Sequence, residues 1–343
     1  MTRHTLATRR PFATRRTLLA ATLAAAGAGL AAPAIAQRAR VLRYGSMLPA
    51  NSIYHRACVM FDDELAKLSS GKFKVEVYPD SQLGTIAEML SSVQTGTLQM
   101  TMAVSAWYSK FMKQLDALTL PYIVPSSDRL QTALNGPLGQ RVATMGESTG
   151  FQIIGYWLIG GRHIVNKLRP VNKPADCAGL KIRVINSQVY IQTFRALGAT
   201  AVAMDPSELY LALQQGVVDG FEYPLPDLIS YKFYEVSKYL SLDGHTTDFF
   251  LISINRPLWQ GFTAEEKAMF AQAMHTAMDW QWREQPNEIA SSLTKLKTLM
   301  QVNELSPADK ALFVEATRPV YQQFEASVGK DFLDFTRQQL GSA

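Results

Sequence analysis

One stretch of the chain, residues 179–224, constrains the fold more than any other, because strand and helix signals alternate through it. Its first residues alternate apolar and basic side chains with the period of a half-buried strand. Further on, Asp205 precedes Pro206 in the arrangement typical of a helix N-terminus. The elements predicted here are a strand over 180–184, a helix over 187–197, a strand over 200–204 and a helix from 206 to 216. This order predicts an α/β fold, in which ligands bind where strand ends meet helix starts.

Arg183 is the candidate binding residue of this stretch. The period-two pattern places it on the same face of the strand as Lys181, and we therefore expect it at the mouth of a site. Its guanidinium group is planar and permanently charged, so it can hold a carboxylate with two hydrogen bonds, which a lysine cannot reproduce. The residues alone also allow a salt-bridged surface arginine.

The rest of the chain extends the same α/β pattern. Strands are predicted over 41–47, 72–78, 100–104, 151–157, 162–166, 240–243 and 249–254, with helices over 53–68, 84–96, 126–146 (interrupted at Pro137) and 263–299. The early strand-helix units favour a mainly parallel sheet with helices on its faces. Ser52 and Thr263 are expected to cap the helices that follow them. The helix that begins after Thr263 is long enough to bridge two domains.

Residues 1–36 are predicted to be a cleaved export signal. Arg15 and Arg16 precede an apolar run over 17–30, and 34–36 offers small residues for cleavage. Paired arginines followed by leucines indicate the twin-arginine route, although a general secretory leader can also carry two arginines. The apolar run is shorter than the roughly 20 residues that span a bilayer. We therefore expect a periplasmic protein that does not span the membrane once the signal is removed.

The charge of the chain is concentrated in this leader. The formal net charge is +5, from 34 basic and 29 acidic residues. Removing the five leader arginines leaves 29 basic residues, equal to the number of acidic ones. A neutral mature chain gives no composition argument for a nucleic-acid partner. With 47% hydrophobic and 18% charged residues, it is typical of a soluble globular protein of about two domains.

Few motifs indicate catalysis or metal binding. Residues 146–150 match GxSxG, but a helix is predicted before Ser148 and a strand after it, the reverse of a serine-hydrolase elbow. The two cysteines, Cys58 and Cys177, lack the spacing of a metal site, and nothing local pairs them, so buried free thiols are expected. No dinucleotide or phosphate-loop motif is present, and no cofactor is predicted. An exported hydrolase that uses Ser148 stays as the alternative function.

Several ordered motifs resemble one protein family. They are GLKIRV over 179–184, SExYxALQxGxVDG over 207–220, KFYEV over 232–236, YPDSQLG over 78–84 and LPY over 120–122. Together they resemble the extracytoplasmic solute receptors of TRAP transporters, the DctP-type family, over most of the chain after the leader. The resemblance implies a type II-like periplasmic binding protein, with two α/β lobes joined by hinge strands and a long bridging helix. It also implies a small organic acid as the ligand and TRAP membrane subunits as partners.

The lobe boundaries follow from the predicted strand crossings. Lobe I would comprise residues 37–159 plus 249–288, and lobe II residues 160–248 plus 289–343. The pair Gly160-Gly161 stands at the first crossing, where it permits a bend or a close approach of a ligand.

The resemblance assigns roles to individual residues. In that family the arginine of the strand motif binds a substrate carboxylate, which implies this role for Arg183. Arg162, in a motif with Asn166, corresponds to a second arginine that often lies near the same carboxylate, although an interdomain ion pair is the alternative. Where many relatives carry Gln-Glu-Asn-Pro, this chain has FEYP, so Glu222 and Tyr223 are expected at the site. Tyr223 can donate a hydrogen bond and also adds an aromatic face.

Three further positions distinguish this chain from relatives that bind sialic acid. Ile86, Val104 and Trp107 stand where those relatives carry polar and charged residues. An apolar pocket with few polar groups suits an apolar ligand body, although Ile86 and Val104 can also be plain core residues. We therefore expect an aromatic or branched monocarboxylate with a 2-oxo or 2-hydroxy group, and weak binding of sugar acids and C4-dicarboxylates.

Overall fold

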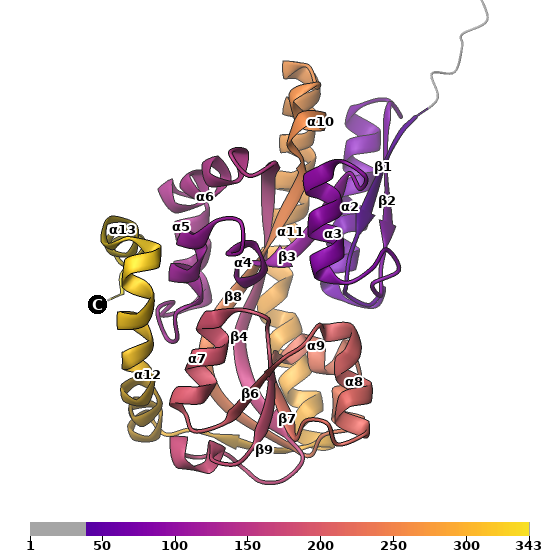
Figure 1. Ribbon diagram of the computed structural model, residues 1–343. Coiled ribbons are helices and arrows are strands. Elements are labelled where there is room, and N and C mark those ends of the chain that lie inside the picture. The colour runs from indigo at the N-terminus through magenta and orange to yellow at the C-terminus, as the bar shows by residue number, and fades with distance from the viewer. Residues whose placement is uncertain (1–38, 343) are drawn as a thin grey trace, which may run out of the picture. The chain divides into compact units, whose positions relative to one another are not determined.

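The computed structural model of the chain describes residues 39–342, so the predicted signal over 1–36 lies outside the described residues. One mixed sheet of nine strands runs through this part of the chain (Figure 1), in the order β2-β1-β3-β8-β4-β7-β5-β6, with β9 paired to β8. The strands are β1 (Arg40–Gly45), β2 (Phe73–Tyr78), β3 (Met100–Val104), β4 (Phe151–Asn166), β5 (Lys181–Val184), β6 (Thr200–Ala203), β7 (Gly220–Pro224), β8 (Tyr239–Asn255) and β9 (Gln301–Glu304).

The first half of the sheet consists of β2, β1 and β3. Both β2 and β3 pair with β1 in parallel, which confirms the predicted strand-helix units. The helices of this half are α2 (Ile53–Leu68), α3 (Ile86–Thr95) and α4 (Ser105–Tyr108). Ser52 caps α2 by accepting a hydrogen bond from the backbone of His55, as predicted.

The second half of the sheet consists of β7, β5 and β6. Strands β6 and β7 flank β5 in parallel, and the connecting helices are α7 (Gln188–Ala196), α8 (Pro206–Gln214) and α9 (Leu225–Ser230). The strands and helices predicted over 180–215 are confirmed within one or two residues. Strand β7 was not predicted, because its five residues are fully buried and lack the alternation of a half-exposed strand.

Two long antiparallel strands, β4 and β8, join the halves. The prediction of two separate strands in each of these regions is wrong, because β4 and β8 continue through both halves and absorb the bend in three register shifts. One of these shifts lies next to Gly160, whose φ of +98° strains any other residue. A Cβ atom there would also stand 2.7 Å from Ile289.

Helix α11 (Ala264–Leu299) runs behind the centre of the sheet in the view of Figure 1. It packs against α2, β4 and α9, and therefore contacts both halves. The predicted capping box of Thr263 and Glu266 is confirmed at its start.

No helix within residues 39–342 combines the length and the apolar character that crossing a membrane requires. The remaining helices are α5 (Ser127–Leu134), α6 (Pro137–Glu147), α10 (Arg256–Gln260), α12 (Pro307–Val328) and α13 (Lys330–Leu340), with 3-10 turns at Lys113–Thr119, Pro174–Cys177 and Phe233–Glu235.

Candidate functional site

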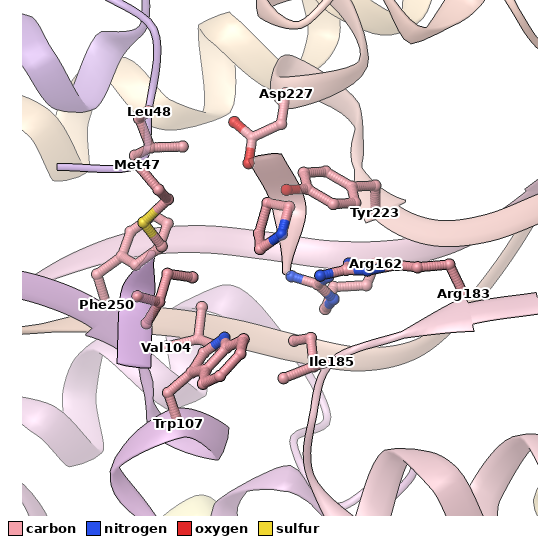
Figure 2. Close-up of a pocket in the computed structure, with 12 residues that line it drawn as sticks. Met47, Leu48, Val104, Trp107, Arg162, Arg183, Ile185, Tyr223, Asp227 and Phe250 are labelled. Carbon is pink, nitrogen blue, oxygen red and sulfur yellow. The ribbon is translucent and has the colours of Figure 1, made fainter. Parts of the chain in front are cut away.

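A cavity lies between the two halves of the sheet, in front of β4 and β8 (Figure 2). Its empty volume is about 300 Å³. Most of the residues that line it stand at or just after the carboxyl ends of β1, β3, β5, β6 and β7, where an α/β sheet binds ligands. The exceptions are Arg162 within β4, Phe250 within β8 and Ile86 at the start of α3. They are Met47, Leu48, Ile86, Val104, Trp107, Arg162, Arg183, Ile185, Pro206, Tyr223, Asp227 and Phe250.

Arg183 supplies a cation with a free donor to this cavity. Its side chain is fully buried, so the prediction that it stands at the mouth of a site is wrong. The junction of β6 and α8 covers it, and its Nε and Nη2 atoms both donate to the carbonyl of Met204, at 2.9 and 2.6 Å. Nη1 has no hydrogen-bond partner among residues 39–342, and Oε1 of Glu222 lies 4.0 Å from it, too far for a hydrogen bond. Burial lowers the pKa of this guanidinium, only partly opposed by Tyr223 and Glu222.

Arg162, on β4, is by contrast paired. Its Nε donates to Oε2 of Glu222 and its Nη2 to Oε1 of the same carboxylate, the latter at 3.0 Å. A second acid, Asp248, lies 3.8 Å from its Nη1 atom. Burial opposes the charge of Arg162, but Glu222, Tyr190 and Asp248 together outweigh it and raise the pKa of the guanidinium above its usual range. This ion pair joins β4 to β7. Both of its residues lie within the predicted lobe II, so it is not the interdomain ion pair given above as the alternative for Arg162.

Behind this pair lies a fully buried chain of charges. The Oε2 atom of Glu222 stands 3.6 Å from Nε2 of His245, and the Nδ1 atom of His245 lies 2.7 Å from Asp243. Burial opposes protonation of His245, but the two carboxylates outweigh it and raise its pKa to about 9. Burial raises the pKa of Asp248 to about 6. The charge of Glu222 is thus shared between Arg162 and His245, and little of it is left to balance Arg183.

The opposite walls of the cavity are apolar. The predicted residues Ile86, Val104 and Trp107 all line the cavity and are buried. Four apolar residues that the sequence did not point to extend this surface, namely Met47, Leu48, Ile185 and Phe250. In Figure 2 the arginines, Tyr223 and Asp227 lie toward the upper right of the cavity, most of the apolar side chains lie to the left, and Ile185 lies beneath the arginines.

The ring of Tyr223 lies above the two arginines in Figure 2. The guanidinium carbon atoms of Arg162 and Arg183 lie 5.2 and 5.7 Å from the centre of its ring, within the range of cation–π attraction. Burial raises the pKa of its hydroxyl above the usual range, so Tyr223 stays a neutral donor.

Two of the predicted residues do not line the cavity. Glu222 supports it indirectly, because its carboxylate holds Arg162 in place. Asn166 lies at the end of β4, where its side chain accepts from the backbone of Leu168 and Arg169 and donates to the carbonyl of Arg169. These bonds close the turn after β4, and the position of Asn166 gives no support to a binding role.

Sequence reasoning missed Asp227, the only acidic residue that lines the cavity among those described. It stands three residues after β7, on α9, and is 2% exposed. The signal that would have found it is topological. Once β7 is recognised as a strand parallel to β5, the residues after its carboxyl end are expected at the ligand.

The other chemical motifs of the sequence lie elsewhere. The GxSxG segment begins in the last two residues of α6 and ends just before β4, and the Oγ atom of Ser148 donates to the carbonyl of Met145. Cys58 and Cys177 are buried and free, as predicted. Residues 39–342 contain no group of three histidine, cysteine or acidic side chains arranged for a metal ion.

Comparison with known proteins identifies close similarity to one group. The family of bacterial extracellular solute-binding proteins, family 7, matches residues 44–327. The chain is 32% identical over 255 residues to the 2,3-diketo-L-gulonate-binding periplasmic protein YiaO of Escherichia coli, covering 74% of this chain and 78% of that protein. It is 30% identical over 302 residues to the sialic acid-binding periplasmic protein SiaP of Vibrio cholerae, covering 88% and 93%.

A solved structure agrees with this similarity. The sugar acid binding protein DctPAm from Advenella mimigardefordensis, in complex with galactonate, superposes with a TM-score of 0.86. The two sequences are 28% identical, and the match covers 89% of this chain and 98% of that chain. The predicted mixed α/β binding-protein fold with a long helix is thereby confirmed.

Proposed function

The chain belongs to the bacterial extracellular solute-binding proteins of family 7, the DctP-type receptors of TRAP transporters, and from this premise we propose that it binds an apolar or aromatic monocarboxylate through Arg183. Membership makes it a solute-binding protein for organic acids and not an enzyme, and implies membrane subunits as partners. We propose that it delivers its ligand to a TRAP permease. Export by the twin-arginine route rests on the leader sequence alone.

The observation that carries the proposal is the unequal charge balance of the two arginines. Arg162 already holds the carboxylate of Glu222, whereas Nη1 of Arg183 has no partner among the described residues. A ligand carboxylate would supply the missing acceptor in a site from which water is largely excluded. Because one cation is unpaired, the arrangement supports one carboxylate. A C4-dicarboxylate would bring a second charge that only the paired Arg162 could meet, so we expect weak binding.

The apolar walls support the choice of ligand body. A sugar acid would place several hydroxyls against Trp107, Val104 and their apolar neighbours, and each buried hydroxyl without a partner costs about 1–3 kcal/mol. We therefore do not expect this chain to bind sialic acid or galactonate, the ligands named for two of its relatives. An aromatic or branched body would instead replace water at these walls. A 2-oxo or 2-hydroxy group would lie near the polar side formed by the arginines and Tyr223.

Binding is proposed to close the predicted lobes, residues 37–159 plus 249–288 and residues 160–248 plus 289–343, over the ligand. Two hydrogen bonds that cross the cavity support a closed arrangement in this structure. The backbone of Ile86, at the start of α3, donates to Asp205 at 3.1 Å, and the hydroxyl of Tyr231 donates to the carbonyl of Met47 at 2.6 Å. Ligand contacts from both sides would favour this state over an open one.

A thermal-shift screen tests the function, because a ligand that binds only the native state raises its melting temperature. We expect phenylpyruvate, benzoylformate and branched 2-oxo or 2-hydroxy acids to stabilise the mature protein more than sialic acid, glucuronate or succinate. A larger shift with a sugar acid or with succinate would contradict the ligand class but leave the receptor function intact. If none of a broad panel of carboxylates shifted the melting temperature, carboxylate binding itself would be refuted.

A further inference from the structure

Asp227 is a second group in the cavity without a partner. It lies on α9, is 2% exposed, and its Oδ1 atom makes no hydrogen bond within residues 39–342. Figure 2 shows its carboxyl group turned toward the cavity, on the same side as Tyr223 and the two arginines. Buried polar atoms are almost always paired in folded proteins, so an unpaired carboxyl at a binding cavity points to a partner supplied by the ligand.

The groups that face Asp227 do not supply this partner. These groups are Arg162 on β4, Tyr223 on β7, Tyr54 on α2, Glu288 on α11 and Tyr231, which directly follows α9. The hydroxyl of Tyr231 donates to Met47, and no hydrogen bond joins the Oδ1 atom of Asp227 to Tyr54 or to Tyr223. Burial raises the pKa of Asp227 to about 7, with Arg162 opposing the rise. Near neutral pH the carboxyl therefore exists in both its neutral and its ionised form.

We propose that Asp227 binds a hydroxyl group next to the ligand carboxylate, so that the site prefers a 2-hydroxy acid to the matching 2-oxo acid or 2-amino acid. The inference rests on the proposed function, in which Arg183 holds that carboxylate. Asp227 and Arg183 line the same polar side of a small cavity, on either side of Tyr223 (Figure 2), which is why the hydroxyl is placed close to the carboxylate.

The three candidate substituents differ in how they match Asp227. A hydroxyl both donates and accepts, so it pairs with either form of the carboxyl. An oxo oxygen only accepts, so it pairs with the neutral form and is repelled by the ionised one. An ammonium group would pair with the ionised form, but it would enter a cavity lined by the two buried guanidinium groups of Arg162 and Arg183. The hydroxyl is thus the substituent that this cavity accommodates at any pH near neutrality.

Calorimetry with matched acids tests this inference on the mature protein. The probes are phenyllactate, phenylpyruvate and phenylalanine, together with the corresponding hydroxy, oxo and amino acids of the leucine skeleton. At pH 8 we expect the hydroxy acid to bind at least about tenfold more tightly than the oxo acid. At pH 6 the difference should shrink, because the neutral carboxyl can donate to the oxo group.

Two variants separate Asp227 from the rest of the pocket. Asp227→Leu, of similar size, should lose the preference for the hydroxy acid but keep the affinity for the oxo acid. Asp227→Asn keeps a donor and an acceptor but cannot ionise, so the ratio of the two affinities should no longer change with pH. Both variants remove an unpaired buried carboxyl, so they are expected to fold, and the comparison of matched acids on the parent protein stands without them.

The outcomes distinguish this inference from the proposed function. If the oxo or amino acid binds the parent more tightly at pH 8, or if Asp227→Leu retains the preference, Asp227 does not select the ligand, although carboxylate binding through Arg183 stands. If no acid of either series binds, the proposed function falls and this inference falls with it.

Discussion

Replacing Arg183 by methionine separates the role of this residue in binding from its role in the fold. Methionine has a similar length and no charge, so it fills much of the same space. Arg183 is fully buried, and burial lowers the pKa of its guanidinium. Its charge therefore brings little stability to the ligand-free protein. We expect Arg183→Met to fold normally and to lose useful affinity for every carboxylate.

The two effects have different magnitudes. Loss of a charge-assisted pair in a closed cleft costs about 2–5 kcal/mol, which weakens binding roughly 30-fold to several thousandfold. For stability, removal of a buried charge in favour of an apolar side chain gains up to about 4 kcal/mol. The carbonyl of Met204, which accepts from Nε and Nη2, loses its donors, and an unsatisfied buried acceptor costs about 1–3 kcal/mol. The net change in the free energy of unfolding should therefore be small.

Arg162→Met provides the contrast within the same cavity. This change leaves the carboxylate of Glu222 buried without its main partner, which costs about 3–5 kcal/mol. Lys181→Met is the matched control, because Lys181 precedes Arg183 on β5 by two residues and is exposed. We expect the free energy of unfolding to fall sharply for Arg162→Met and to change little for the other two variants.

Urea denaturation and calorimetry measure both effects. Stability comes from the unfolding midpoint and slope without ligand, and affinity from titration with the acid that the thermal screen selects. If Arg183→Met binds like the parent, Arg183 is not the anchor of the carboxylate. If it destabilises the protein as much as Arg162→Met does, the reasoning that Arg183 is the unpaired cation is refuted.

Two further predictions concern closure and pH. Tyr231→Phe removes the hydrogen bond to Met47 across the cavity and should weaken ligand binding about 5- to 10-fold. Tyr210→Phe is the control, because the hydroxyl of Tyr210 bonds Glu235 away from the cavity, and it should bind like the parent. Equal affinities of the two variants in calorimetry would contradict a role of Tyr231 in closure. The pKa of His245 rises from an ordinary 6.5 to about 9 in the folded protein, so its contribution to stability is fully present below pH 6.5 and is lost as the pH rises through about 9. We expect urea unfolding to show that, between pH 6.5 and 9, the free energy of unfolding of the parent falls by on the order of 3 kcal/mol more than that of His245→Gln. Equal falls in the two proteins would contradict the raised pKa of His245.

Local signals allowed much of the fold to be predicted. The caps at Ser52 and Thr263 formed as expected, because a capping side chain bonds to the backbone only two or three residues away. The strand and helix order over 180–215 was also recovered, since its periodicity and its Gly and Pro positions lie within single elements. These features depend on near neighbours in the chain, which the sequence displays directly.

Features set by distant pairing were not recovered in the same way. Strands β4 and β8 were each predicted as two short strands, because residues 158–161 in β4 and residues 244–248 in β8, with Gly160 and Gly244 among them, lack a regular strand pattern. In the folded protein the paired residues of β4 and β8 lie between 73 (Asn166 and Tyr239) and 104 (Phe151 and Asn255) positions apart along the chain, and register shifts absorb the irregular positions. Strand β7 lacked alternation because both of its faces are buried, a property that only its neighbours in the sheet confer.

The candidate site shows the same difference between features encoded locally and features set by distant pairing. Local sequence was sufficient to indicate which residue types are available, above all Arg183, Arg162, Tyr223 and an apolar set, because motif and strand position are encoded locally. How their charges are shared follows from the packing of distant strands. Packing β7 against β4 brings Glu222 to Arg162 and leaves Arg183 with a free donor, and the turn into α9 carries Asp227 into the cavity. Whether a charge is paired depends on distances of a few ångströms between residues far apart in the chain, and these distances exist only once the sheet has formed.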